Sequence, residues 1–244
     1  MIQKFFTLAF GSAVDLFYPP QCVLCNKALT GKEKYICNDC FDSLPLISGP
    51  HCPKCSRPIR TRNGENQLCG ICRIQPDKNI KITVAAAEYQ GLMKRLIHLY
   101  KYERQQFLSK FFAHIIVEQI KKKNIESSFD LLVPIPLHWT RKRWRGFNQA
   151  RELCRNISPL INVPIVPESA FCRVRRTTPQ VQLNAASRTA NIRGAFAVRK
   201  NKYIKDKNIA LVDDVYTTGA TSGECSRMLL GSGAKSVSLL IIAR

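Results

Sequence analysis

Apolar residues fall into two kinds of segment over the last two-thirds of the chain. Short continuous runs predict buried strands, at Lys81–Tyr89, Asp130–Pro136, Ile209–Val212 and Val237–Ala243. Longer stretches with an apolar residue every three or four positions predict helices, at Leu92–Lys123, Asn148–Asn156 and Ala220–Leu230. A basic turn is expected at His138–Arg145. Because strands alternate with helices, the pattern predicts an α/β fold built on a parallel sheet.

The first 80 residues follow a different pattern, rich in proline and glycine and too poor in apolar residues for a core of their own. The apolar run Phe5–Val14 has ten residues, and about 20 are needed to cross a bilayer, so no transmembrane helix is expected. We interpret the run as an amphipathic helix, with a short signal peptide as the alternative. The linker Arg73–Lys78 then predicts two units, residues 1–75 and residues 80–244.

Eight of the eleven cysteines form four Cys-x-x-Cys pairs, a spacing typical of structural zinc sites. Adjacent pairing predicts two closed tetrahedral sites, with Cys22, Cys25, Cys37 and Cys40 on one ion and Cys52, Cys55, Cys69 and Cys72 on the other. A cross-braced order and a disulfide framework are the alternatives, and the second conflicts with the cytosolic character of an α/β domain. The other three cysteines are interpreted as ordinary apolar residues. Metal binding would supply much of the folding free energy of the segment.

Two carboxylates and a turn of small residues follow the strand Ile209–Val212. Ligands bind beyond the carboxyl ends of parallel strands. Asp213 and Asp214 leave a buried strand there, so each needs a polar partner such as a ribose hydroxyl or a magnesium-bound ligand. The turn, which runs into a helix N-terminus, can present backbone N–H groups and hydroxyls to a phosphate. Its residues are Thr217, Thr218, Gly219 and Thr221.

Basic residues outnumber acidic ones by 38 to 17, which gives a formal net charge of +21. The excess lies mostly after residue 80, where 28 basic residues accompany 11 acidic ones. Such a field attracts nucleic acid, anionic membrane or phosphorylated metabolites and does not choose among them. A solvated basic face is the alternative interpretation.

The segment Ile209–Thr221 resembles the phosphoribosyl-pyrophosphate (PRPP) signature of type I phosphoribosyltransferases. Its pattern is four apolar residues, Asp-Asp, two further residues and then Thr-Thr-Gly-x-Thr. The resemblance implies that Asp213 and Asp214 hold the ribose hydroxyls. It also implies that the 5′-phosphate is held by Thr217, Thr218, Gly219, Ala220 and Thr221.

The rest of the chain resembles the ComF competence-protein family. The residues that carry this resemblance are Pro19–Cys25, Val133–His138, Arg141–Ala150 and Arg175–Gln180, with Leu183, Arg188, Asn191 and Arg193–Phe196. The family joins an N-terminal double zinc ribbon to a type I phosphoribosyltransferase-like sheet with flanking helices, and it is implicated in natural transformation. The resemblance therefore implies action on incoming single-stranded DNA, with a DNA-uptake helicase or an inner-membrane channel as a partner. It implies a cytoplasmic location, either free or peripheral at the inner membrane.

By the same resemblance the pyrophosphate would be held, with Mg²⁺ bridging its phosphates, by Pro136, Leu137, His138 and Arg141. Lys94 or Lys101 would add countercharge. No residue identifies an acceptor base, and no catalytic residue is assigned. The chain has only 23 residues after Thr221, so no C-terminal hood over a base is expected, and the zinc module is an alternative hood. Whether the protein turns over PRPP stays open.

Aromatic residues interleave with cations around residues 139–155, which is typical of a groove for single-stranded DNA. The candidate DNA-binding residues are Lys142, Arg143, Arg145, Arg173, Arg175 and Arg176. In the alternative interpretation Trp139, Trp144 and Phe147 are core residues and the arginines serve the pyrophosphate alone. A phosphoribosyltransferase of nucleotide salvage, acting on a small acceptor, is the competing function.

Overall fold

The computed structural model describes residues 20–244 apart from 31–32, 61–63, 75–76, 104 and 178–189. The helix expected at Phe5–Val14 lies outside the described residues. Among those described, no helix is both long enough and apolar enough to cross a membrane. The predicted division at residues 75–80 stays a prediction.

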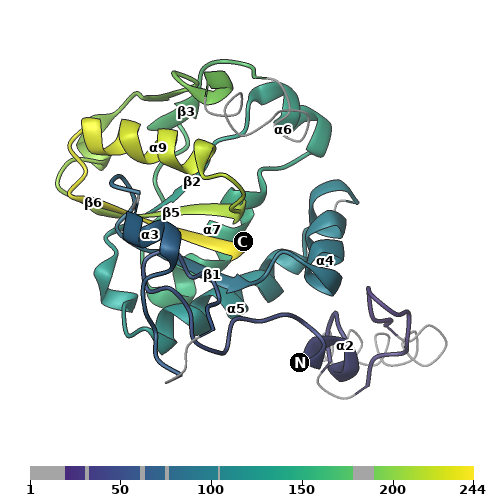
Figure 1. Cartoon of the computed structure of the whole chain (residues 1–244). Coiled ribbons are helices and arrows are strands. Elements are labelled where there is room, and N and C mark those ends of the chain that lie inside the picture. Colours follow the sequence, from purple (N-terminus) through teal and green to yellow (C-terminus); the bar gives the residue numbers. More distant parts are fainter. Residues whose placement is uncertain (1–19, 31–32, 61–63, 75–76, 104, 178–189) are drawn as a thin grey trace, which may run out of the picture.

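A four-stranded parallel sheet forms the centre of the molecule (Figure 1). Its strand order is β1-β6-β5-β2, with bounds Thr83–Ala87, Ser236–Ala243, Asn208–Val215 and Leu131–Pro134. The central strands are apolar on both faces because helices cover both. Ala210 and Val212 of β5 join the core on one face, and Ile209 and Leu211 join the core on the other. The predicted α/β fold with a parallel sheet is confirmed.

Helices α5 (Leu108–Lys122) and α7 (Gln149–Ile161) pack on one face of the sheet, and α9 (Ala220–Gly231) packs on the other (Figure 1). An antiparallel ribbon of β3 (Phe171–Arg173) and β4 (Phe196–Val198) lies on the α9 side. This ribbon was not predicted, because its two short strands are separated by 22 residues. Short 3₁₀ turns occupy Glu126–Ser128 and Asn201–Tyr203.

The single helix expected at 92–123 is two helices, α4 (Gly91–Tyr102) and α5. No proline or glycine marks the break. At the break Phe107 stacks on Tyr35 of the cysteine-rich segment, with ring centroids 4.9 Å apart. Tertiary packing therefore overrides the continuous helical period.

The basic segment expected as a turn at 138–145 is mostly helical, since α6 spans Trp139–Arg145. Strand β5 also continues through Val215, past the predicted end at Val212. The paired carboxylates Asp213 and Asp214 therefore belong to the strand itself. Hydrogen bonding to β6, in which Asp213 pairs with Ile241, maintains the strand where the hydrophobic pattern has ended.

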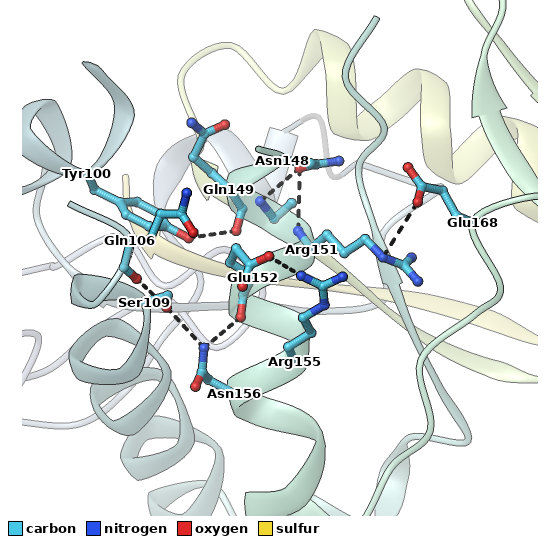
Figure 2. Close-up of polar contacts among 11 residues, drawn as sticks. Tyr100, Gln106, Ser109, Asn148, Gln149, Arg151, Glu152, Arg155, Asn156 and Glu168 are labelled. Carbon is cyan, nitrogen blue, oxygen red and sulfur yellow. Dashed lines mark hydrogen bonds and ion pairs between the residues drawn. The ribbon is translucent and has the colours of Figure 1, made fainter. Parts of the chain in front are cut away.

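Helix α7 is tied to its neighbours by polar contacts (Figure 2). The Asn148 side chain caps α7 by accepting from the Ala150 N–H at 3.0 Å, and it donates to the Ile135 carbonyl at 3.1 Å. The buried Tyr100 hydroxyl of α4 donates to the Gln149 carbonyl at 2.8 Å (Figure 2). These bonds hold α4, α7 and the chain after β2 in one fixed arrangement.

The cysteine-rich segment folds as two small knuckles with short helices α2 (Asn38–Asp42) and α3 (Gly70–Ile74) (Figure 1). The chain that joins the knuckles lies along the edge strand β1. Leu46 pairs antiparallel with Ala87, and the Ile47 N–H donates to the Ala86 carbonyl at 2.9 Å. The second knuckle thus lies beside the sheet.

Candidate functional site

A cleft of about 1340 Å³ opens at the carboxyl ends of the parallel strands. Five parts of the chain line it: α4 with the residues around it, the segment after β2 with α6, the end of β3 with the segment after it, the end of β5 with the start of α9, and Leu239 and Ile241 of β6. This is the place where parallel sheets bind ligands. The position agrees with the one predicted from the sequence.

Asp213 and Asp214 lie at the floor of this cleft, on β5. Asp213 Oδ1 accepts a hydrogen bond from the Asp214 N–H at 2.9 Å. Asp214 Oδ1 lies 2.8 Å from Lys101 Nζ of α4, and the two side chains are only 14% and 16% exposed. A carboxylate this deep needs a cation or donor, and Lys101 supplies it here. The sequence indicated Lys101 as countercharge for a pyrophosphate but not as a partner of the aspartates.

The turn between β5 and α9 depends on Gly219, whose φ is +77°. A Cβ built on Gly219 would lie 2.8 Å from Tyr216 Cζ and closer still to its hydroxyl. Only glycine suits this position. The turn leads into a twelve-residue helix whose first residues line the cleft, so the positive end of the helix dipole lies at the cleft.

The predicted phosphate residues divide between two hollows. The cleft is lined by Thr217, Gly219, Ala220 and Thr221. Thr218 instead lines a smaller hollow of about 240 Å³ beside the second knuckle, where Thr217 also contributes. Thr217 therefore lines both hollows, and Thr218 lines the smaller one.

The predicted pyrophosphate residues Pro136, Leu137 and His138 line the same cleft. His138 is buried, and its Nδ1 lies 2.8 Å from Thr140 Oγ1. Arg141 lies in α6, and its side chain lies outside the described part of the structure. The structure thus brings the two predicted phosphate segments to one cleft.

Cations outnumber acids among the lining residues. Five are lysine or arginine and three are acidic: Lys94, Arg95, Lys101, Arg173 and Arg176 against Glu103, Asp213 and Asp214. Lys94 and Lys101 of α4 were predicted as countercharge, whereas Arg95, His98 and Tyr102 of the same helix were not predicted. Their contribution depends on the position of α4 against the sheet, which the helical period does not specify.

The candidate DNA residues have different surroundings. Arg173 and Arg176 line the cleft, and Arg173 also donates to Thr177 Oγ1. Arg175 donates to the carbonyls of Asn191 and Arg193, at 2.9 and 2.6 Å, so it holds the loop before β4. On α6, Arg143 is exposed, whereas the side chains of Lys142 and Arg145 lie outside the described part.

The eight ribbon cysteines form two clusters, each with its four sulfur atoms within 4.8 Å of one another. The clusters follow adjacent pairing, as predicted, and the cross-braced alternative is wrong. The sulfurs of Cys25 and Cys37 lie 3.6 Å apart, and those of Cys55 and Cys69 lie 3.7 Å apart. Tetrahedral zinc with Zn–S bonds of about 2.3 Å would require about 3.8 Å. All eleven cysteines are free thiols, so the disulfide alternative has no support.

Protonation in the first cluster also fits a metal. Burial raises the pKa of Cys22, but backbone hydrogen bonds at Cys37, Leu24 and Cys25 outweigh burial and lower that pKa to about 6. For Cys40, burial and the neighbouring thiols raise the pKa far above its usual range. Four thiolates cannot share this space without a cation to balance them. Both closed shells fit structural zinc.

The second knuckle contacts the phosphate turn through the last residue described. Arg244 donates from Nη1 to the Cys55 carbonyl, and its guanidinium lies 5.1 Å from the centre of the Tyr216 ring. Tyr216 in turn packs against Gly219. A chain of contacts therefore runs from a ligand of the second metal cluster to the turn before α9.

Comparisons with known proteins match both parts of the chain. Residues 13–73 match the family model described as double zinc ribbon domain. The chain is 29% identical to "DNA utilization protein YhgH" of Escherichia coli (strain K12), over 94% of this chain and 99% of that protein. It is 28% identical to "Competence protein F" of Haemophilus influenzae, over 93% and 98% of the two chains. With "Competence protein ComFC" of Bacillus subtilis it shares 28% identity over 87% and 85%.

Solved structures match the chain more distantly. A purine phosphoribosyltransferase from Pyrococcus horikoshii is 14% identical over 54% of this chain and 72% of its own, with a TM-score of 0.33. The allosteric regulatory enzyme of purine biosynthesis is 18% identical over 55% of this chain, with a TM-score of 0.35, and this chain spans 25% of its length.

The relatives match along nearly their whole length, across the ribbon and the α/β part together. Such joint coverage is what the expected architecture requires, and a shared ribbon alone would not produce it. The comparisons support the ComF family for this chain.

Proposed function

We propose that this protein acts in the uptake or use of DNA and that its cleft binds PRPP with Mg²⁺. The coarse role follows from the relatives, which are named competence proteins and a DNA utilization protein. The ligand follows from the chemistry of the cleft. A phosphorylated ribose needs acceptors for its hydroxyls and donors for its phosphates, and the cleft places both within one space.

One observation carries the ligand assignment. Two adjacent carboxylates, Asp213 and Asp214, lie near the carboxyl end of the central strand β5, and a short turn leads from there to the N-terminus of α9, whose N-cap is Gly219. Carboxylates accept from hydroxyls, and helix N-termini bind phosphates. Because the two features lie consecutively on one short segment, they suit the two ends of a ribose 5-phosphate.

The cations on the cleft walls suit the pyrophosphate. Lys94 and Arg95 are exposed on α4, and Arg176 faces the same space from the segment after β3. Carboxylate oxygens are the ligands that Mg²⁺ prefers, so Asp213 is a candidate ligand for Mg²⁺ brought by the substrate. Asp214 is already paired with Lys101, so a ligand that uses Asp214 competes with that lysine.

The α6 surface supports binding of single-stranded DNA. Trp139 and Trp144 are 65% and 67% exposed, and Arg143 between them is exposed as well. Phe147 is buried, so the core interpretation holds for the phenylalanine and is wrong for the two tryptophans. Exposed aromatic faces beside cations are typical of surfaces that stack unpaired bases.

The test is a calorimetric titration of the purified protein with PRPP, with and without Mg²⁺ and single-stranded DNA, alongside an assay for released pyrophosphate. We expect Mg²⁺-dependent PRPP binding by the wild type. The change Asp213→Asn with Asp214→Asn should abolish it, since an amide offers one acceptor oxygen in place of two. Asp206→Asn is the matched control, because Asp206 is exposed, away from the cleft, at a φ of 60° that asparagine tolerates.

The outcomes separate the candidate functions. Pyrophosphate released with DNA present would indicate a transferase that acts on DNA, and release only with a small nitrogenous acceptor would indicate salvage. Binding without release would indicate a sensor or a DNA-binding protein that responds to PRPP. Equal PRPP affinity in the wild type and the double variant would contradict the assignment of the loop.

A further inference from the structure

Two aromatic rings from different helices meet on the wall of the cleft. Tyr102 ends α4 and Trp144 lies in α6, and both line the cleft. Their ring centroids are 6.0 Å apart with an interplanar angle of 61°, an edge-to-face arrangement. The His98 ring also packs against Tyr102, with ring centroids 4.8 Å apart. The edge-to-face arrangement therefore presents the face of one ring and the edge of the other to the cleft.

Both rings remain open to solvent, which is uncommon for large aromatic side chains. Trp144 is 67% exposed and Tyr102 is 44% exposed. Burial of an aromatic ring removes a large apolar area from water and is strongly favourable. Adjacent aromatic surface left open inside a concave site is typical of a place that receives another apolar or flat group.

The charges around the rings indicate which kind of flat ligand group would bind there. Lys94 and Arg95 line the same cleft from α4, and Arg143 is exposed next to Trp144. The acid on this wall, Glu103, has His98 Nδ1 within 3.8 Å. Cations beside aromatic faces favour a ring that carries phosphate, which is the chemistry of a nucleotide.

We propose that Tyr102 and Trp144 form a nucleobase clamp, in which an unpaired base stacks against the two rings beside the phosphate turn. This proposal rests on the proposed function, because it names the chemical class of a second ligand that binds in the same cleft as PRPP. Stacking uses the π-face that every base has, so the clamp tolerates any sequence. The base comes either from a single strand or from a free nucleobase or nucleotide.

The test uses the two tryptophans of the chain as separate reporters. In Trp139→Phe, tryptophan emission comes from Trp144 alone, and in Trp144→Phe it comes from Trp139 alone. Each variant is titrated with oligothymidylate, with an abasic strand of the same length and with adenosine monophosphate. The abasic strand carries the phosphates without the bases.

We expect a base-bearing probe to quench Trp144 and the abasic strand to leave it unchanged. Quenching by oligothymidylate alone would identify a strand as the source of the base, and quenching by the mononucleotide would identify a free ligand. The clamp is overturned if the abasic strand quenches Trp144 as strongly as oligothymidylate, or if no base-bearing probe quenches it.

Substitution of the tyrosine gives an independent test. Tyr102→Ala should weaken binding of the base-bearing probe about 5- to 150-fold, the range for one lost stacking contact. Tyr102→Phe keeps the ring and should bind like the wild type, and this variant shows that any loss comes from stacking. Phe41→Ala is the control, since Phe41 is 40% exposed, comparable with Tyr102, but is not among the cleft residues. Unchanged binding in Tyr102→Ala would also overturn the clamp.

PRPP affinity separates this proposal from the previous one. Both Tyr102→Ala and Trp144→Ala should keep the PRPP affinity of the wild type, because neither ring belongs to the phosphate turn. If neither the wild type nor the variants bind PRPP while bases still quench Trp144, the PRPP assignment is wrong and the clamp stands. If PRPP binds but Trp144 responds to no base, the clamp is wrong and the PRPP assignment stands.

Discussion

Lys101 Nζ and Asp214 Oδ1 form an ion pair of 2.8 Å that links helix α4 to the central strand β5. The link crosses the floor of the cleft, with both side chains mostly removed from water. It therefore has two roles. It balances a carboxylate near the end of a buried strand, and it holds α4 against β5.

Lys101→Met should lower the free energy of unfolding by about 1–3 kcal/mol, between the values for exposed and for fully buried pairs, because Asp214 is left without its cation. The measurement is unfolding in urea. Lys94→Met is the control, since Lys94 lines the same cleft but is exposed. Combining Lys101→Met with Asp214→Asn should recover part of the loss. Additive losses would contradict a coupling between the two side chains.

Gly219→Ala should lower the stability by about 1–2 kcal/mol and weaken PRPP binding, because the residue has a positive φ and no room for a Cβ. The matched control is Gly223→Ala in α9, where a Cβ would meet nothing within 4 Å. That change should raise the stability by about 0.5–1 kcal/mol, because alanine favours a helix interior over glycine. Thermal unfolding and PRPP titration of both variants check these signs. Equal effects would show that the turn does not depend on Gly219.

Elemental analysis of freshly purified, reduced protein should find close to two zinc ions per chain. Cys25→Ser and Cys55→Ser should each reduce the content to about one, because each removes a ligand from a different cluster. Cys172→Ser, which changes a cysteine outside both clusters, should leave the content unchanged. A chelator should unfold the first 75 residues and leave most of the sheet intact. A single zinc ion in the wild type would contradict the two-site assignment.

Stability in acid should depend on Glu224. Hydrogen bonds from Arg227, at 2.8 and 2.9 Å, and from the Gly194 N–H lower the pKa of this carboxyl. The folded-state pKa lies below the unfolded value of about 4.3, so the stabilisation is full above that value. It is lost as the pH falls through the folded-state pKa.

The difference in unfolding free energy between the wild type and Glu224→Gln should therefore shrink as the pH is lowered below about 4. Urea unfolding at several pH values measures it. Glu118→Gln on the exposed side of α5 controls for the loss of one negative charge. A difference that stays constant or grows in acid would contradict the assigned role of Glu224.

Binding of single-stranded DNA should weaken steeply with salt. If the strand contacts Z phosphates, log K falls with log salt at a slope near −0.7Z, so about five contacts give about −3.5. Changing Arg141, Lys142, Arg143 and Arg145 together to alanine should flatten the slope. Lys121→Ala with Lys122→Ala, at the end of α5, is the control for reduced charge elsewhere. A slope untouched by the quadruple change would mean that these cations serve a small ligand.

The elements that were predicted are those specified locally. Apolar runs mark β5 and β6, because a strand covered on both faces has no polar side to interrupt it. The four metal-binding pairs follow from spacing, since a Cys-x-x-Cys turn directs two sulfurs at one ion, whereas the structure decided for their adjacent order over the cross-braced one. The break between α4 and α5 has no such mark. It depends on Phe107 stacking against Tyr35, a contact between segments far apart in sequence.

The candidate site divides in the same way. Asp213, Asp214 and Gly219 lie on one continuous segment, so a motif could predict their shared role. Tyr102 belongs to the site only because α4 ends beside α6, and no periodicity in either helix indicates that position. The sequence could not predict the exposure of Trp144 either, because a tryptophan in a basic segment can lie in the core or on the surface.

The strand β1 would be an open edge of the sheet if the chain between the two knuckles did not cover it. Pro45 and Ile47 exchange backbone hydrogen bonds with Glu88 and Ala86, both at 2.9 Å, and the Lys54 carbonyl accepts from the Thr83 N–H at 2.8 Å. A fragment cut at residue 80 would expose these groups, and an uncovered edge is a template on which a second copy can add a strand. Such a fragment should self-associate, and one that starts before Pro45 should remain monomeric.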